Sequence, residues 1–233
     1  MRISIRLMAC FVFSIVNVNL AVGQFTDPDG NIIVDFTEDF ESGVANFTAP
    51  SRSLATLILT GGVDDSAFIR AATDPNFQGV VLRAELDGRG PGPASGGAFA
   101  GDYIASNVES VSFSIRHDNT ENATFGARFA TSANFPAVNF GLGTLAPGEF
   151  QEFTIDFTDP SLFGIEAFGP TTFEQIASQI GNIQITTTAA NDSIYNVDLD
   201  NFQITTAASS VPEPSSLALL MGAAGLLSIR RRR

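Results

Sequence analysis

Residues 111–116 read VSFSIR, so apolar side chains alternate strictly with polar ones. Successive side chains of a β-strand point to opposite faces, and this stretch is therefore predicted to be a strand with one buried face. The same period of two recurs along the chain at 34–40, 80–86, 125–129, 153–157 and 183–186. Further strands are expected at 54–60, 67–71, 137–142 and 194–205. Many strands with one apolar face each predict two sheets packed face to face, an all-β sandwich.

One stretch has the period of a helix instead. In residues 171–182 the apolar side chains of Phe173, Ile176 and Ile180 recur at spacings of three and four. Thr172 is placed to cap the first turn, and Gly181 is placed to end the helix. We therefore expect one short helix beside the two sheets.

The alternation of inward and outward side chains shifts by one residue within the last predicted strand. Leu199 and Phe202 are both expected to face the core, although they are three positions apart. One extra residue between them predicts a β-bulge around Asp200 and Asn201, which turns a side chain out of the ladder. If the first and last strands are neighbours, the bulge brings Asp200 close to Glu41, which follows the first strand.

The two ends of this region carry a resemblance to a known group of domains. The sequences FESG at 40–43 and LDNF at 199–202 resemble those of jelly-roll carbohydrate-binding modules and their galactose-binding-like relatives. In many such modules, acidic residues of the first and last strands hold a structural calcium ion. The resemblance therefore implies Glu41 and Asp200 as side-chain ligands of Ca²⁺, with backbone carbonyls supplying the remaining oxygen ligands. The alternative is two solvated acids at strand ends.

The aromatic composition bears on glycan binding. The chain has 21 Phe but no Trp, and many of the Phe alternate with polar residues and are predicted to lie in the core. Modules of this type usually hold sugars with Trp or Tyr rings, and only Tyr103 and Tyr195 are available here. Outward-facing arginines offer a second way to bind a glycan, through uronates, or are simply solvated; they are Arg83, Arg116 and Arg128, with His117 at a strand end.

No pattern typical of catalysis is present. His117 is the only histidine, and the sequence has no Gly-x-Ser-x-Gly turn and no zinc-binding cluster. The acids Glu38, Asp39 and Glu41 do not alternate as a strand-borne set of glycosidase carboxylates would. We therefore expect a non-catalytic protein, and keep a divergent jelly-roll hydrolase as an alternative.

Charge excludes one class of partner. Residues 24–210 contain six arginines and 24 acidic residues, a net charge of −18, and the chain has no lysine. Such a surface repels nucleic acid and anionic lipid, so we expect no nucleic-acid partner. The only cysteine is Cys10, so residues 24–210 contain neither a thiol nor a disulfide.

The N-terminal end has the pattern of a signal peptide. Arg2 and Arg6 precede an apolar stretch, and small residues at 21–23 offer a signal peptidase site. We therefore expect residues 1–23 to be removed by signal peptidase. Cys10 lies within the apolar stretch, too early in the chain for a lipoprotein site.

The C-terminal end has three consecutive parts. The sequence Val211, Pro212, Glu213 and Pro214 precedes an uncharged apolar run at 215–229, and the run precedes Arg230, Arg231, Arg232 and Arg233. The prolines disfavour helix before the run, so the tetrapeptide is expected to be extended and accessible. A transmembrane helix over the run would be about 22 Å long, short of the hydrocarbon core of about 30 Å. The arginines would hold the C-terminus on the cytoplasmic side.

This tail, residues 211–233, resembles the PEP-CTERM sorting signal. In that family a membrane-embedded protease-transpeptidase, exosortase, recognises the signal, and the protein reaches the cell surface or an exopolysaccharide matrix. The resemblance implies an exported precursor anchored in the membrane, and a structural or adhesive role for residues 24–210 in a biofilm matrix. The alternatives are a plain tail anchor, and a domain whose function is to bind exopolysaccharide or another glycan.

Overall fold

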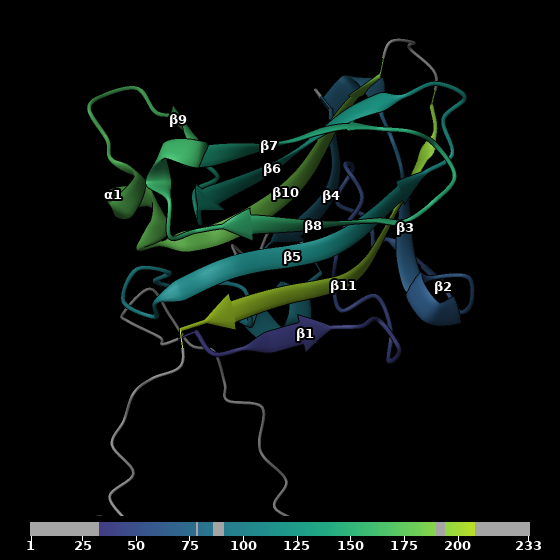
Figure 1. The fold of residues 1–233 in the computed structure, drawn as a ribbon, viewed down its shortest axis with the longest axis horizontal. Coiled ribbons are helices and arrows are strands. Elements are labelled where there is room, and N and C mark those ends of the chain that lie inside the picture. The colour runs from purple at the N-terminus through teal and green to yellow at the C-terminus, as the bar shows by residue number, and fades with distance from the viewer. Residues whose placement is uncertain (1–32, 78, 86–90, 190–193, 208–233) are drawn as a thin grey trace, which may run out of the picture.

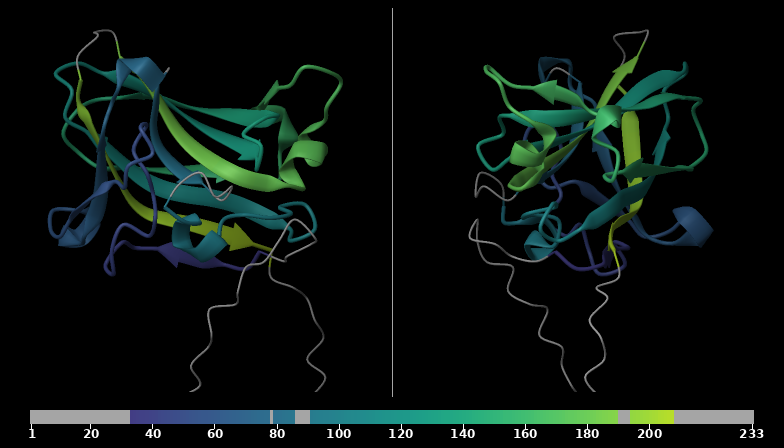
Figure 2. Two further views of the ribbon diagram at one scale, coloured as in Figure 1. Left: turned by 180° about the vertical axis from the view of Figure 1, so that it is seen from behind. Right: turned by 60° about the vertical axis from the view of Figure 1, so that its left-hand side comes forward.

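A computed structural model describes residues 33–77, 79–85, 91–189 and 194–207. These residues form two antiparallel β-sheets packed face to face, with one short α-helix at one end (Figures 1 and 2). The predicted two-sheet β-sandwich is confirmed. The predicted signal peptide at 1–23 and the sorting signal at 211–233 lie outside the described residues.

The strands divide between the sheets as follows. The first sheet, here sheet A, has the order β2-β3-β11-β5-β8, and β1 also pairs with β11. Its strands are β1 (Phe36–Glu38), β2 (Thr56–Ile58), β3 (Phe68–Ala72), β5 (Val108–His117), β8 (Gln151–Asp156) and β11 (Asn196–Thr206). The second sheet, sheet B, has the order β4-β10-β6-β7-β9. Its strands are β4 (Val80–Glu85), β6 (Ala123–Thr131), β7 (Ala137–Leu145), β9 (Gly164–Glu166) and β10 (Ile180–Ala189).

The order of the longer strands identifies the topology. Without the three-residue strands β1, β2 and β9, sheet A reads β3-β11-β5-β8 and sheet B reads β4-β10-β6-β7. Counted along the chain, these eight strands have the orders 1-8-3-6 and 2-7-4-5. Two four-stranded sheets interleaved in this way form a jelly roll, so the predicted topology is confirmed.

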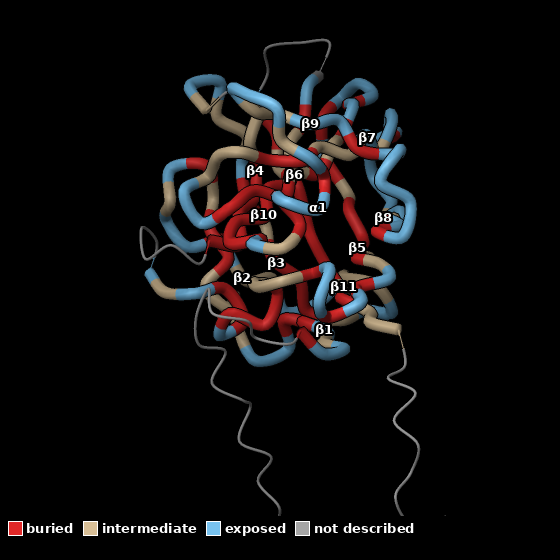
Figure 3. The backbone as a smooth tube through the Cα atoms, turned by 90° about the vertical axis from the view of Figure 1, so that its left-hand side faces the viewer, coloured by how far each residue is buried: buried red, intermediate tan, exposed pale blue. Residues whose placement is uncertain are grey.

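The core between the sheets is rich in phenylalanine, as predicted. Phe113 of β5 and Phe202 of β11 are stacked, with ring centroids 5.3 Å apart. Phe47 and Phe99 also contact Phe202, edge to face. The buried parts of both sheets face one another around this core (Figure 3).

The predicted bulge in the last strand is confirmed. The register of β11 against β5 shifts between Asp200 and Gln203, and Asn201 has φ of 50°. On its other side β11 pairs first with β3 and then, after the bulge, with β1. The first and last strands are therefore neighbours, and Asp200 lies where β1 and β3 meet along β11.

The predicted helix is present but shorter than expected. Helix α1 (Phe173–Ala177) begins at a capping box in which Thr172 and Gln175 each bind the other's backbone N–H. The prediction that Gly181 ends the helix was wrong, because Gly181 lies in β10. A Cβ at Gly181 would lie 2.6 Å from the backbone of Ser132, so close chain packing requires the glycine. In the part of the chain that the structure describes, no helix has the length and apolarity needed to cross a bilayer.

Three predictions about which side chains face solvent were wrong. Val34 was expected in the core, but it precedes β1 and is 52% exposed. Arg83 and Glu85 of β4 were expected on a solvated face, but both are buried. The segment that follows β1 pairs with the edge of β4 through Thr48, and Arg52 of this segment binds the side chain of Glu85.

Stability should depend on Phe113 more than on its cross-strand partner Phe153. Phe113 is fully buried, so Phe113→Ala should lower the free energy of unfolding by about 3–5 kcal/mol. Phe153 lies opposite it on β8 and is only partly buried, so Phe153→Ala should cost less. Urea denaturation of both variants would test this. Equal losses, or a loss below about 1 kcal/mol for Phe113→Ala, would contradict the packing described.

Candidate functional site

The loop at residues 61–67, between β2 and β3, is held by Asp200 from the bulge. Asp200 is fully buried, and its Oδ2 accepts hydrogen bonds from the backbone of Val63 (2.8 Å) and the hydroxyl of Ser66 (2.9 Å). A Cβ at Gly62 would lie 2.6 Å from the same oxygen, so the loop approaches Asp200 as closely as only glycine permits.

Two further side chains bind the same loop. Glu41 Oε1 accepts from the backbone N–H of Ala67 at 2.8 Å, and Arg116 donates to the carbonyl of Gly61 at 3.0 Å. The structure therefore brings Glu41 and Asp200 onto one loop. As the structure stands, both carboxylates accept hydrogen bonds from the loop.

Glu41 and Asp200 have the right type of ligand atom for calcium, but they supply too few of them. Two carboxylates are hard oxygen ligands of the type that Ca²⁺ takes, but Ca²⁺ needs six to eight oxygens. Among the described residues, no group of three or more His, Cys, Asp or Glu side chains is placed to hold a metal ion. Loop carbonyls would have to complete the set around Glu41 and Asp200.

The outer face of sheet A has a cross-strand row of charges. Asp198 of β11 is buried and lies opposite Arg70 of β3 and Arg116 of β5. Arg70 Nε binds Asp198 Oδ1 at 2.6 Å, and Arg116 Nη2 binds Oδ2 at 2.7 Å. The hydrogen bond to Asp198 raises the pKa of Arg70. Arg116 also lies over the rings of Phe68 and Phe150, so it is not the freely solvated arginine that the sequence favoured.

The outer face of sheet B has a row of polar side chains across four adjacent strands. Gln184 of β10 lies opposite Arg83 of β4 on one side and Arg128 of β6 on the other, and Arg128 lies opposite Asn139 of β7. Directly opposite residues have their Cβ atoms within about 5.5 Å, so these four side chains are neighbours. We call these four residues the polar row.

Hydrogen bonds fix the orientation of this row. Arg128 binds both carboxylate oxygens of Glu166 on β9, at 2.8 and 3.2 Å. Asn134 Oδ1 accepts from Arg128 at 2.9 Å and from Gln184 Nε2 at 2.9 Å. Asn139 donates to Glu166 at 3.4 Å. The bond from Arg128 lowers the pKa of Glu166 below its ordinary value.

Several buried polar atoms beside the row have no hydrogen-bond partner in the described part of the chain. Glu85 Oε1 accepts from Arg52 at 3.1 Å and from Arg83 at 3.3 Å, but its Oε2 has no partner. Arg83 Nε and both amide atoms of Asn182, which lies opposite Glu85, also lack one. Buried polar atoms normally have partners, so this end of the row has capacity to bind water or another polar group.

The row borders a groove of about 460 Å³. Its lining includes Asn76, Phe77, Arg83, Arg128, Glu166 and Gln184. Next to Glu166 the loop after β9 carries Phe168, which is 97% exposed and packs on Phe135 with ring centroids 4.4 Å apart. The groove therefore combines a fixed polar floor with one aromatic ring in its lining, that of Phe77.

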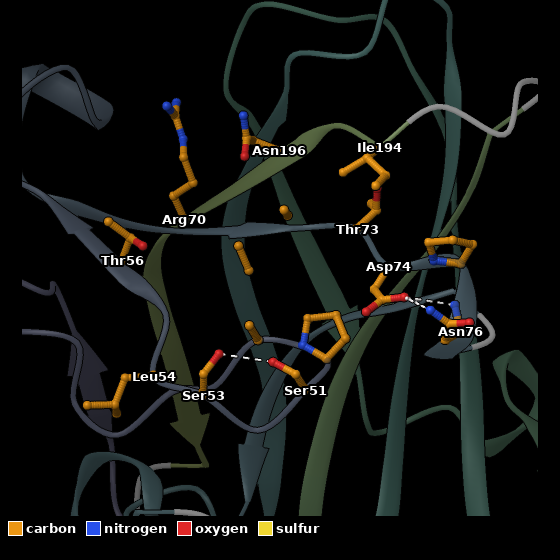
Figure 4. A pocket seen from close by; sticks show the side chains of 15 residues that line it. Ser51, Ser53, Leu54, Thr56, Arg70, Thr73, Asp74, Asn76, Ile194 and Asn196 are labelled. Atoms are coloured by element: carbon orange, nitrogen blue, oxygen red, sulfur yellow. Dashed lines mark hydrogen bonds between the residues drawn. The ribbon is translucent and has the colours of Figure 1, made fainter.

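A second hollow, the edge pocket, lies between segment 49–56 and the end of β3 and has a volume of about 580 Å³ (Figure 4). Its lining includes Ser53, Thr56, Arg70, Asp74 and Asn76. Asn76 lines both the edge pocket and the groove. It belongs to the 3₁₀ turn Pro75–Phe77, which separates them.

Three residues considered for sugar contact do not face solvent. Tyr103 is 1% exposed and donates to the carbonyl of Phe99 at 2.8 Å. Tyr195 is buried and forms a hydrogen bond with Thr187. His117 is also buried, and its Nε2 lies 3.2 Å from the carbonyl of Leu145. Alternation correctly predicted that Arg83 and Arg128 lie on the outer face of their sheet. They are not solvated, however, because Arg83 is paired with Glu85 and Arg128 with Glu166.

Periodicity in the sequence did not reveal Glu166 and Asn134, which line the groove, or Phe168 on the loop after β9. Glu166 lies on a strand of three residues, too short to show a period of two. Asn134 has φ of 65° in a turn, and only the turn brings its amide to Arg128 and Gln184. The polar positions that alternate with Ile183 and Ile185 are the signal that could have located the row.

Several solved structures resemble the described fold. One is an exo-beta-agarase, with TM-score 0.49 and 13% identity over 72% of this chain, which spans only 25% of the agarase. Another is the L4b domain of human laminin alpha-2, with TM-score 0.49 and 10% identity over 76% of this chain and 99% of that domain. A third is a C-terminal family 22 carbohydrate-binding module of Clostridium thermocellum, with TM-score 0.45 and 14% identity over 79% of this chain and the whole module.

None of these scores reaches 0.5, so the jelly-roll assignment rests on the chain's own strand order. Comparison with curated protein sequences found no match. The C-terminal end does match a family model over residues 210–233, the range that holds Val211–Pro214, the apolar run and the arginines. Residues 210–233 are thus a PEP-CTERM protein-sorting motif, as the tail predicted.

Proposed function

We propose that this chain is an exported, non-catalytic protein whose jelly roll binds a neutral glycan in the groove on sheet B. An exosortase would sort it to the cell surface or an exopolysaccharide matrix, where glycan binding would give it an adhesive or structural role. The observation that carries the proposal is the polar row, four hydrogen-bonding side chains fixed in register across sheet B.

The chemistry of the groove suits a sugar. Amide and guanidinium groups held by their neighbours present donors and acceptors at fixed positions, as hydroxyl recognition requires. Arg83 Nε is buried without a partner beside the groove and would gain one from a ligand hydroxyl. Phe77 in the lining offers an apolar face against which a sugar ring can pack.

Charge favours a neutral ligand over a uronate. Arg83 is paired with Glu85 and Arg128 with Glu166, so both groove arginines are already neutralised. The domain around them carries a net charge of −18 and repels polyanions. A neutral polysaccharide meets neither obstacle.

The state of the groove carboxylates supports binding rather than hydrolysis. A glycosidase needs a carboxylic acid whose pKa is raised so that it can donate a proton. Glu166 has the opposite shift, caused first by its hydrogen bond from Arg128. The other carboxylate beside the row, Glu85, is bound by Arg52 and Arg83. A divergent hydrolase is therefore the weaker alternative.

The tail determines where the protein is sorted. The PEP-CTERM motif implies processing by an exosortase, and hence a membrane-anchored precursor. Signal peptidase would remove residues 1–23, and the arginines at 230–233 would retain the uncut tail on the cytoplasmic side.

We also propose a structural Ca²⁺ on the loop at 61–67, held by Glu41 and Asp200 and completed by loop carbonyls. What supports it is the convergence of both carboxylates on one loop in a domain with no cysteine. The ion would fix the loop against the start of β3. It would have no part in the groove on the other sheet.

The groove is tested by affinity electrophoresis of the full chain in a zwitterionic detergent. Native gels would contain xylan, mixed-linked β-1,3-1,4-glucan or agarose, with alginate as the acidic polymer. At least one neutral polymer should retard the protein, and alginate should not. Gln184→Leu, which removes one amide from the polar row, should abolish the retardation, whereas Gln203→Leu on the exposed face of β11 should not. Retardation by alginate alone, or equal retardation of both variants, would contradict the proposal.

The sorting motif is tested in a host that contains an exosortase. Glu213→Ala should leave an uncut precursor in the inner membrane, because the recognised tetrapeptide is changed while the apolar run is kept. Mass spectrometry of surface-exposed protein would give the C-terminus. Mature surface protein that retains Arg230–Arg233 would show that the tail is an anchor and not a processing signal.

The calcium site is tested by thermal unfolding of protein first treated with a chelator. Added Ca²⁺ should raise the midpoint, because an ion that binds only the folded form stabilises it by RT ln(1 + [L]/Kd). The rise should disappear in the double variant Glu41→Gln, Asp200→Asn, which keeps size but removes charge. Mg²⁺ at matched ionic strength is the control for charge screening. An equal response to both ions, or none to Ca²⁺, would rule the site out.

A further inference from the structure

We propose that the edge pocket is a second subsite for the same glycan, so that one extended chain occupies the groove, passes Asn76 and enters the edge pocket. The inference rests on the proposed function of the groove. It adds a second place of binding, at the edge of the sandwich, and a ligand of defined character: a linear neutral oligosaccharide long enough to reach both hollows.

The two hollows meet at one residue. Asn76 lines the groove with Phe77 and Val80, and lines the edge pocket with Asp74 and Pro75. No other residue is shared between the linings of these two hollows. A ligand that leaves the groove and passes over Asn76 on this turn would therefore reach the edge pocket.

The shared side chain is exposed and held in place. Asp74 Oδ1 accepts hydrogen bonds from the backbone of Asn76 at 2.9 Å and from its Nδ2 at 2.8 Å. Figure 4 shows both bonds at the rim of the edge pocket. Because Nδ2 is held by Asp74, Asn76 Oδ1 has a fixed position from which it can accept a hydrogen bond from a ligand hydroxyl.

The edge pocket has the same chemical character as the groove. The hydroxyl oxygens of Ser51 and Ser53 lie 3.0 Å apart, and Thr56 of β2 lies opposite Arg70 of β3 in the same lining (Figure 4). Arg70 is paired with Asp198, so it adds no unbalanced charge to the lining. Leu54 and Ile194 are 49% and 69% exposed and give the lining apolar surface. Hydroxyls beside apolar surface, with charge compensated, match a neutral sugar.

Both hollows have the size of ligand sites. Their volumes, about 460 and 580 Å³, lie within the roughly 300–1,000 Å³ typical of ligand pockets. A ligand that fills only the groove gains nothing from the second hollow. Affinity is therefore expected to increase with chain length until the ligand spans both, since the second contact is made within one complex.

Isothermal titration of the full chain in a zwitterionic detergent would test this with xylotriose, xylohexaose and the β-1,3-1,4-linked tri- and hexasaccharides. For the sugar type that binds, the hexasaccharide should bind at least tenfold more tightly than the trisaccharide. Thr56→Leu adds bulk and removes a hydroxyl in the edge pocket. It should abolish this length dependence and leave trisaccharide affinity unchanged. Thr154→Leu, on exposed β8 at the other edge of sheet A, is the matched control and should bind as the unmodified protein does.

The outcomes separate the two proposals. Equal affinity for both lengths, or a length dependence that survives Thr56→Leu, would overturn the second subsite while the groove stands. Loss of trisaccharide binding in Gln184→Leu but not in Thr56→Leu would support binding of the trisaccharide in the groove and not in the edge pocket. No binding of any oligosaccharide, together with no retardation by any neutral polymer, would overturn the groove and with it the subsite.

Discussion

The pairing of β11 with its neighbours is the interaction on which the rest of the structure depends. This last strand lies between β5 on one side and β3 and β1 on the other, so it joins the two parts of sheet A. Its inward side chain Phe202 stacks on Phe113 in the core. Its outward carboxylates do two different things, because Asp198 joins Arg70 to Arg116 and Asp200 holds the loop before β3. The bulge lies between the segment of β11 that pairs with β3 and the segment that pairs with β1, so that one strand pairs with both.

The groove depends on sheet B in a comparable way. The register of β4, β10, β6 and β7 places four polar side chains in one row, and the short strand β9 adds Glu166 at its end. Rigid strands fix such side chains more firmly than loops do. Turns between the strands complete the lining with Asn76 and Asn134. The proposed binding of a glycan requires polar side chains that are held in this way.

Alternation in the sequence predicted the sandwich because period two reports directly which face of a strand is apolar. The slip of parity between Leu199 and Phe202 likewise predicted the bulge. The sequence could not show that Arg83 and Glu85 would be buried, since the contacts that the segment around Thr48 and Arg52 makes with β4 are tertiary. It gave no sign of β9 or of the groove rim for the same reason. Turn geometry and three-residue strands leave no periodic signal.

Binding of a neutral glycan to the outer face of sheet B can be observed by NMR. Amide chemical shifts of the protein would be followed during titration with xylohexaose or with the β-1,3-1,4-linked hexasaccharide. We expect the largest changes on Gln184, Arg128, Asn139 and Asn76, with the loop at 61–67 unaffected. Changes confined to the face of sheet A around Asp198, or no change with either sugar, would contradict it.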